Sequence, residues 1–311
     1  MSPWARYLVL LAAPVAAPVA AVVCGSGCNQ LLGLSPTELD VTDVDGAPRD
    51  GLLFTPDGSA QCGPRPAFES WRFALATLPF DVPEARVTDF TFYRSGAEIR
   101  AIAVHANAFH DVGPDGASQR IEALTPPSTA TVSLPRMSPD GAVLWFTQSG
   151  SAPGVYRASR ASGWTRQRAD LEFPNAEAVE PGAVGFFAGV ARMVVSVQTI
   201  EGSPTLHELS SMDGLAWTPL DTIRFPTSGL GDRHAILSPD GCYLLYTAAP
   251  GSPELRVAAR DPDGTFTTST KLVAPSMLTS SPTHPVLTPD ADSLWFTYVV
   301  GGESELYRGT P

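Results

Sequence analysis

Three segments of the chain share one pattern, and they decide the fold: Met137-Ser-Pro-Asp-Gly-Ala-Val-Leu-Trp-Phe-Thr147, Leu237-Ser-Pro-Asp-Gly-Cys-Tyr-Leu-Leu-Tyr-Thr247 and Leu287-Thr-Pro-Asp-Ala-Asp-Ser-Leu-Trp-Phe-Thr297. Each segment consists of an apolar residue, a tight turn and an alternating strand, and the last has one extra residue after its turn. Proline sets φ for the turn, and Asp with Gly completes it. The pattern therefore predicts a repeated strand–turn–strand unit.

The spacing of these segments predicts further copies. Their turns start at Ser138, Ser238 and Thr288, which are 100 and 50 residues apart. A period of 50 residues places weaker copies near positions 188 and 88, and apolar, alternating segments occur at 186–197 and 90–104. A period of this length is typical of repeat architectures.

Each unit continues with a second strand, a short glycine turn and an outer strand, which begins near Ala117, Trp164, Leu215 and Thr265. Units of about four short antiparallel strands, closed in a ring, form a β-propeller, so the predicted fold is all-β. The last unit ends at Pro311 without an outer strand, and Phe68–Leu78 lies upstream as a strand without a sheet. Placing this strand in the last blade closes the ring and removes two exposed edges.

This arrangement gives five blades over residues 67–311. The alternative is six blades, with residues 51–58 in an extra partial blade. We expect residues 28–66 to be a tether and lead-in, kept in solvent by four aspartates, Asp40, Asp43, Asp45 and Asp50.

The N-terminus is typical of an export signal. One positive side chain in Met1–Arg6 precedes the apolar stretch Tyr7–Val23, which is short for a membrane span and contains two prolines. Residues 1–27 are therefore predicted to be a signal peptide. The alternative is a buried or membrane helix.

The segment Gly25-Ser-Gly-Cys28 resembles the processing site of bacterial lipoproteins, in which small residues precede a cysteine that becomes lipidated. Ser26 and Gly27 fit this pattern, whereas Gly25 stands where a leucine is usual. The resemblance implies that Cys28 carries the lipid anchor. Cys24 is the rival position, and simple cleavage without a lipid is a further alternative.

Composition excludes one class of partner. The 311 residues include 20 basic and 32 acidic side chains, so the formal net charge is −12. Phosphate binding requires patches of Lys and Arg, so we expect no nucleic-acid partner. Two further cysteines, Cys62 and Cys242, can pair in an oxidising compartment, and the sequence leaves open whether they do.

The Ser/Thr-Pro-Asp-Gly turn before an alternating aromatic strand resembles the WD40-like propeller repeat of the TolB type. Together with the lipoprotein-like signal, it is similar to exported propeller lipoproteins of GC-rich bacteria. The resemblance covers about 240 residues. It implies a protein held in the periplasm or at the outer membrane, and a role as an interaction platform, by analogy of fold alone.

A second, shorter resemblance concerns Ser211-Met-Asp213-Gly214-Leu-Ala-Trp217. It is similar to the Asp box of sialidase-type propellers, one residue short of the usual spacing. In those families the box is a structural hairpin, in which the aspartate caps the turn and the aromatic residue packs underneath. We expect the same structural role here, with glycan chemistry as the alternative.

The candidate binding residues lie in two inner strands. His234 and His284 each lie three residues before the repeat leucine, so in neighbouring blades their rings would meet near one mouth of the channel. Asp232 and Arg233 precede the first of them. Two imidazoles can share a metal or an anion. The alternative is two independent histidines bonded to backbone or water, and since two ligands do not define a metal site, we predict no metal and no cofactor.

Other aromatic and histidine residues receive structural assignments. His105 and His110 are five apart, which puts them on opposite faces of an extended strand, and His207 lies in an ordinary blade strand. Trp145 and Trp295 occupy one repeat position, with Tyr246 at or next to it, which indicates blade packing rather than a row of sugar-stacking rings.

Enzyme signatures are mostly missing. The chain has no Gly-x-Ser-x-Gly elbow, no His-Glu-x-x-His and no phosphate loop. A five-bladed glycosidase needs two or three carboxylates that converge on the channel. Asp89, Asp232 and Glu180 can reach that region, but their spacing does not select them.

The sequence thus predicts a non-catalytic envelope lipoprotein whose propeller binds an unidentified protein or ligand. The alternative is a secreted propeller that binds or hydrolyses carbohydrate.

Overall fold

The structure is a computed structural model of the whole chain. It describes residues 53–54, 60–62, 68–78, 87, 89–169, 171, 173, 175–200, 202–212, 214, 216–226, 231–248, 254–272, 282–300 and 303–311. All of them belong to one compact unit, Thr42–Pro311. The predicted signal peptide, Cys24 and Cys28 lie outside the described residues.

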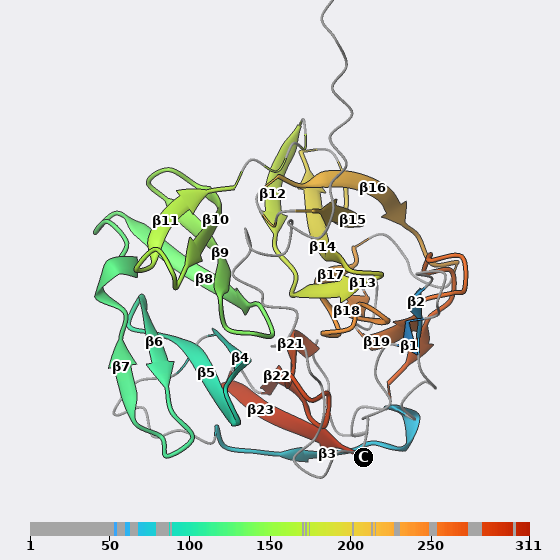
Figure 1. Cartoon of the computed structure of the whole chain (residues 1–311), viewed down its shortest axis with the longest axis horizontal. Coiled ribbons are helices and arrows are strands. Elements are labelled where there is room, and N and C mark those ends of the chain that lie inside the picture. Colours follow the sequence, from blue (N-terminus) through green and yellow to red (C-terminus); the bar gives the residue numbers. More distant parts are fainter. Residues whose placement is uncertain are drawn as a thin grey trace, which may run out of the picture. The chain divides into compact units, whose positions relative to one another are not determined.

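Five antiparallel sheets form a five-bladed β-propeller, which confirms the predicted fold class (Figure 1). From the inner to the outer strand, blade 1 contains β4 (Asp89–Ser95), β5 (Glu98–His105), β6 (Ala108–Val112) and β7 (Ser118–Arg120), and blade 2 contains β8 (Ala130–Met137), β9 (Val143–Gly150), β10 (Gly154–Ser159) and β11 (Thr165–Arg168). In blade 3 the inner position is divided between β12 (Ala176–Glu180) and β13 (Val184–Phe187), followed by β14 (Val190–Thr199), β15 (Thr205–Ser211) and β16 (Thr218–Ile223).

Blade 4 contains β17 (Arg233–Leu237), β18 (Tyr243–Ala248), β19 (Glu254–Ala259) and β20 (Thr270–Lys271). Blade 5 contains β21 (Pro282–Leu287), β22 (Leu294–Val300), β23 (Glu303–Thr310) and β3 (Arg72–Leu75). The outer strand of blade 4 therefore begins later than the predicted Thr265, because the Asp261–Gly264 turn is followed by five residues outside the ladder, among them the buried Phe266.

The repeated turn forms because its side chains bond its own backbone. In blade 2, Ser138 Oγ accepts from the N–H groups of Ala142 and Val143 at 3.1 and 2.9 Å, and Asp140 Oδ1 accepts from Ala142 N–H at 3.0 Å. Gly141 takes a left-handed conformation with φ of 71°. Such local bonds are why Ser, Asp and Gly are favoured in turns.

The ring closes as predicted. Strand β3 pairs antiparallel with β23, from Tyr307 opposite Leu75 to Thr310 opposite Arg72. The strand is shorter than the predicted Phe68–Leu78, because Phe68–Ser70 forms a 3₁₀ turn, η2. This turn buries Phe68 and Trp71 in a core cluster with residues of blades 4 and 5.

The six-blade alternative is wrong. Strands β1 (Leu53–Phe54) and β2 (Ala60–Gln61) pair only with each other and join none of the five blades. They form a separate two-stranded ribbon in the lead-in.

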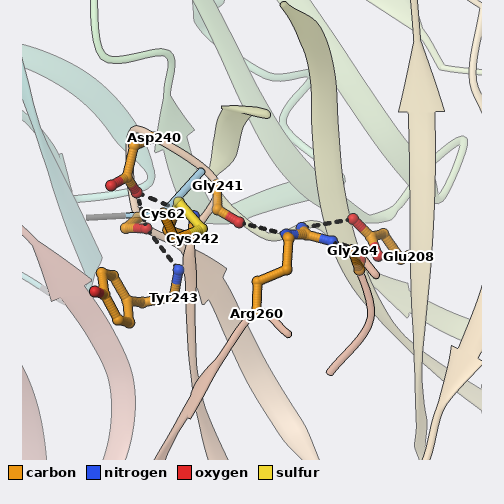
Figure 2. Close-up of a disulfide and its surroundings, with 9 residues drawn as sticks. Cys62, Glu208, Asp240, Gly241, Cys242, Tyr243, Arg260 and Gly264 are labelled. Atoms are coloured by element: carbon orange, nitrogen blue, oxygen red, sulfur yellow. Dashed lines mark hydrogen bonds and ion pairs between the residues drawn. A yellow bond between two sulfur atoms is a disulfide. The ribbon is translucent and has the colours of Figure 1, made fainter. Parts of the chain in front are cut away.

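Cys62 and Cys242 form a disulfide, which settles the pairing that the sequence left open (Figure 2). The bond ties the lead-in to the start of β18 across 180 residues of sequence. A cross-link over a loop of this length typically stabilises a fold by about 2–4 kcal/mol. The lead-in is thus fastened to blade 4 by the disulfide, and the segment that follows it joins blade 5 through β3.

A buried arginine joins blades 3 and 4. Arg260, which follows β19, makes two contacts to Glu208 of β15, at 2.7 and 3.2 Å (Figure 2). Its Nε and Nη1 also donate to the carbonyl oxygens of Gly241 and Gly264, and Phe187 and Phe266 each place a ring within 4.5 Å of the guanidinium carbon. The side chains of Arg260 and Glu208 are 1% and 7% exposed, so this ion pair is fully desolvated.

A related contact joins blades 1 and 2. Arg160, 100 residues before Arg260, donates to Asp111 of β6 at 3.3 Å and to the Tyr93 hydroxyl at 2.7 Å. It lies over the rings of Tyr93 and Trp164. Here the side chains of Arg160 and Asp111 are 37% and 22% exposed. The arginine–carboxylate contact is therefore partly solvated at the interface of blades 1 and 2 and buried at the interface of blades 3 and 4.

No helix among the described residues is long and apolar enough to span a membrane.

Candidate functional site

The inner strands of all five blades line an axial cavity of about 30 Å³. Its walls are apolar except for Thr91 and Arg136, and Pro139, Pro239 and Pro289 of the repeated turns lie at one end. A volume of this size holds one or two water molecules. The cavity itself is therefore too small for a sugar ring or a peptide, and a larger ligand must bind at an end of the channel.

Polar side chains from four blades meet at the other end, where the inner strands begin. We call this group, Asp89, Glu180, His234 and His284, the histidine cluster. The imidazole rings of His234 and His284 lie with centroids 4.6 Å apart, nearly perpendicular to one another. Nδ1 of His234 is 3.4 Å from Glu180 Oε2, and Nδ1 of His284 is 3.2 Å from Asp89 Oδ1. Each histidine is thus backed by a carboxylate from a different blade.

A β-bulge aims both histidines at this end. The inner strands of blades 2, 4 and 5 each carry one extra residue relative to the second strand. At the bulge, Leu134, His234 and His284 have φ of 52°, 52° and 51°. This left-handed conformation is uncommon outside glycine, and it re-aims the side chain that adopts it.

In blade 3 a break in the inner strand, rather than a β-bulge, leaves a polar side chain at this end. Its inner strand stops at Glu180, and Pro181, Gly182 and Ala183 separate β12 from β13. A Cβ atom on Gly182 would lie 2.1 Å from the carbonyl oxygen of Val194, so only glycine fits there. Glu180 is thereby left at the end of a strand, beside His234.

Burial sets the protonation of the cluster. It is the main cause that lowers the pKa of His234 to about 2, with His284, Arg136 and Arg233 adding smaller effects. Burial also lowers the pKa of His284, against the opposing effect of Asp89. Burial raises the pKa of Glu180, and the N–H of His234 opposes that shift. Both imidazoles are therefore neutral at physiological pH.

Arg136 lines the axial cavity and acts electrostatically on both histidines of the cluster. It is 2% exposed, and the hydrogen bond that its guanidinium makes within the described part of the chain runs from Nη1 to the carbonyl oxygen of Pro135 at 3.1 Å. Asp89 and Glu180 act on it electrostatically, but neither lies within ion-pair distance. A guanidinium has five N–H donors. Several donors of Arg136 are thus left for water or a bound group.

The structure brings together only part of the predicted site. His234 and His284 meet as predicted. Arg233 points toward blade 3 and donates to Gln198 Oε1 at 2.8 Å. Asp232 is buried, its carbonyl oxygen accepts from Ser196 Oγ, and its charge acts on Tyr246. Asp89 and Glu180, which spacing did not select, take the places beside the histidines.

The prediction for His105 and His110 is wrong. Their rings lie 5.4 Å apart, because a turn at Ala106–Asn107 puts them on neighbouring strands rather than on one strand. His105 pairs with Ala108 and His110 with Ala103, so the two histidines are diagonal neighbours. His207 lies in β15 as predicted, hydrogen-bonded to Thr205 and Thr222.

The aromatic repeat positions pack between blades, as predicted. Trp145 is buried against Trp217 of blade 3, and Trp295 against Phe90 and Phe92 of blade 1. Trp217 of the Asp-box-like segment therefore packs between blades 2 and 3, and Asp213 lies outside the described residues, so the Asp-box role stays a prediction.

Among the described residues, no group of three or more His, Cys, Asp or Glu side chains is arranged to hold a metal ion. The histidine cluster supplies two imidazoles, and each carboxylate contacts the Nδ1 atom of one ring.

The low pKa of His234 predicts a loss of stability in acid. Below pH 6.5 His234 binds a proton in the unfolded chain but not in the folded protein. The free energy of unfolding therefore falls as pH falls. We expect the stability of His234→Asn to fall less steeply between pH 7 and pH 5, by at most about 1.4 kcal/mol per pH unit. Asparagine tolerates the left-handed backbone.

Urea unfolding of both proteins at several pH values measures this difference. The raised pKa of Glu180 acts in the opposite direction in both proteins, so their comparison isolates His234. Parallel curves would contradict the assignment.

No family model matches the chain, and no curated protein matches it. Solved structures do. A thermostable family-43 glycoside hydrolase is 14% identical, with 74% of this chain and 90% of that chain covered and a TM-score of 0.52. TolB from Acinetobacter baumannii is 15% identical, with 73% of this chain covered and a TM-score of 0.46. The putative TolB from Agrobacterium tumefaciens is 13% identical, with a TM-score of 0.45 over 71% of this chain and 82% of that chain.

The chain spans 55% of the length of the Acinetobacter protein. At these identities the similarity concerns the propeller fold alone.

Proposed function

We propose that the protein is an exported, lipid-anchored binding propeller whose ligand docks on the histidine cluster. The observation that carries the proposal is the convergence of Asp89, Glu180, His234 and His284 from four blades at one end of the channel. Two of these groups also bond the bulge backbone, since Asp89 Oδ2 accepts from Leu134 N–H at 3.3 Å and Glu180 Oε2 accepts from His234 N–H at 3.4 Å. Asp89 Oδ1 and His234 Nδ1, however, are buried without a hydrogen-bond partner among the described residues, and a buried polar atom left unpaired in this way is typical of a site that takes up an ion or a ligand.

A thermal-shift screen of saccharides, short peptides and envelope-protein fragments tests the proposal. A ligand at 100 times its dissociation constant adds about 2.7 kcal/mol of stability. We expect the shift to disappear in Glu180→Gln and His284→Asn. Asp263→Asn, on an exposed turn of blade 4, is the matched control and should keep the shift. A ligand that shifts all variants equally binds elsewhere and would argue against the cluster.

The anchor has its own prediction. Cys28→Ala should abolish metabolic labelling with a fatty acid and move the protein from the membrane fraction to the soluble fraction, because a buried acyl chain contributes about 0.8 kcal/mol per CH₂. The Cys62–Cys242 disulfide supports an oxidising compartment such as the periplasm. Label that persists in Cys28→Ala would assign the lipid to Cys24 or to another site.

A second candidate is glycoside hydrolysis at the same cluster. It rests on two carboxylates at one channel end, one of them, Glu180, with a pKa raised by burial, as a general acid requires. Chromogenic glycosides test it directly. Turnover that is lost in both Asp89→Asn and Glu180→Gln would replace the binding proposal, whereas no turnover across a broad panel would remove this candidate.

A further inference from the structure

The two histidines of the cluster are arranged as a pair rather than as separate core residues. They occupy the same bulge position in neighbouring blades, where blade 2 has Leu134. Left-handed backbone is unfavourable for any residue other than glycine. In blade 2 this conformation projects an apolar side chain, whereas in blades 4 and 5 it projects two imidazoles whose centroids are 4.6 Å apart.

The carboxylates fix which nitrogen of each ring is available. Nδ1 of each imidazole faces a carboxylate oxygen, at 3.2 Å for His284 and 3.4 Å for His234. Neither contact has the geometry of a hydrogen bond, since Asp89 Oδ1 and His234 Nδ1 have no hydrogen-bond partner among the described residues. A carboxylate on that side of each ring still favours, by its charge, the tautomer with the proton on Nδ1, which leaves the lone pair on Nε2. Imidazole that ligates a metal nearly always has its other nitrogen oriented by a carboxylate or carbonyl group in this way.

The charges nearest the pair also suit a cation. Asp89 and Glu180 contact the imidazoles within 3.4 Å, whereas no ion pair among the described residues joins Arg136 or Arg233 to either carboxylate. Nitrogen ligands suit zinc, copper and nickel, whereas calcium and magnesium require oxygen ligands.

We propose that His234 and His284 bind one divalent transition-metal ion of the zinc, nickel or copper class through Nε2, with Asp89 and Glu180 orienting the rings. The inference rests on the proposed function and deepens it. Zinc prefers four ligands, and two imidazoles leave two positions for water or for a donor atom of the docked ligand. The ion would then be the contact through which the propeller recognises a carboxylate or imidazole on its partner.

Equilibrium dialysis of the purified protein without a polyhistidine tag, against Zn²⁺, Ni²⁺ and Cu²⁺, tests the site. We expect one ion per chain, and at least a tenfold loss of affinity in His234→Asn and in His284→Asn. Asp89→Asn removes only the orienting charge and should weaken binding about tenfold. Cu²⁺ bound to the wild type should show two nitrogen ligands by electron paramagnetic resonance.

The chain supplies a matched control in its second histidine pair. His105 and His110 also lie close, at 5.4 Å, but Nδ1 of His110 is hydrogen-bonded to Ser118 Oγ, and neither ring has an ion contact with a carboxylate among the described residues. His110→Ala should therefore bind the ion as the wild type does. Loss of binding in His110→Ala alone, or no binding to the wild type, would overturn the proposal. Ca²⁺ binding that depends on Glu180 but not on His284 would also overturn it.

The ligand screen separates this inference from the proposed function. A ligand that binds the metal-free protein and is lost in Glu180→Gln would support the docking site without the ion. Metal binding without any ligand would support the ion site alone. Each variant is first checked by its thermal unfolding, and a glutamine replacement at 234 or 284 serves where asparagine lowers stability.

Discussion

Glu208→Ala should lower the free energy of unfolding by about 3–5 kcal/mol, more than most other single substitutions at the blade interfaces. The change leaves the Arg260 guanidinium, 1% exposed, without its carboxylate partner. An arginine cannot escape this cost by losing its proton. The bonds to Gly241 and Gly264 and the rings of Phe187 and Phe266 remain, but none of them carries a compensating charge. Urea unfolding followed by tryptophan fluorescence measures the loss.

The chain contains the control for this experiment. Asp111→Ala removes the corresponding carboxylate at the interface of blades 1 and 2, where its two partners, Arg160 and Arg100, are 37% and 28% exposed and water can replace it. We expect a cost of about 1–2 kcal/mol there. Replacing both buried partners, as Glu208→Leu with Arg260→Met, should recover most of the stability, since a buried pair can be exchanged for apolar side chains. Equal losses in Glu208→Ala and Asp111→Ala would contradict the role of burial.

Phe68→Ala should lower the free energy of unfolding by about 3–5 kcal/mol. Phe68 is 1% exposed in the 3₁₀ turn that leads into the closing strand, and its ring lies 5.0 Å from that of Trp71 and 5.6 Å from that of Tyr243. Its removal leaves a cavity between blades 4 and 5, where the N-terminal segment seals the ring. Loss of this seal also exposes β23 as an unpaired edge, so aggregation on heating should increase.

Leu75→Ala is the matched control, because Leu75 lies in the closing strand itself but is 65% exposed. We expect a change of about 0.5 kcal/mol there. If Phe68→Ala unfolds at the same denaturant concentration as Leu75→Ala, the N-terminal segment does not belong to the cooperative unit, and closure of the ring by this segment would be wrong.

Much of the fold was predictable because the turn chemistry is local. Ser138 and Asp140 bond the backbone of their own turn, so the motif specifies its structure wherever it recurs. The closing strand was predictable from a count of strands and from the cost of open edges. The split of the inner strand in blade 3 was not, because it depends on the contact between Gly182 and the carbonyl of Val194 across the strand pair.

The candidate site was predictable only in part. Equal repeat offsets were enough to bring His234 and His284 together. The carboxylates beside them depend on where each inner strand begins or stops, which differs from blade to blade. Arg136 was missed, although a signal existed: it occupies the repeat position held by Ile236 and Val286, so a charge stands where the repeat is otherwise apolar. The pairing of His105 with His110 was missed because the turn between them was not recognised.

Arg160 and Arg260 were also detectable. Each follows its Ser-Pro-Asp-Gly turn by the same number of residues, which repeats in sequence as it does in space. Their partners, Asp111 and Glu208, were not detectable, because the contact crosses from one blade to the next. Interface contacts of this kind depend on the radial packing of the blades, which no single repeat encodes.

The central claim is that the end of the channel formed by Asp89, Glu180, His234 and His284 is where this propeller binds. Parallel thermal-shift screens of the wild type and of Glu180→Gln/His284→Asn, each with and without Zn²⁺, test it most directly. We predict at least one metal or ligand that stabilises the wild type and has no effect on the double variant. Stabilisation of both proteins by the same compounds to the same extent would contradict the claim and place binding on another surface of the propeller.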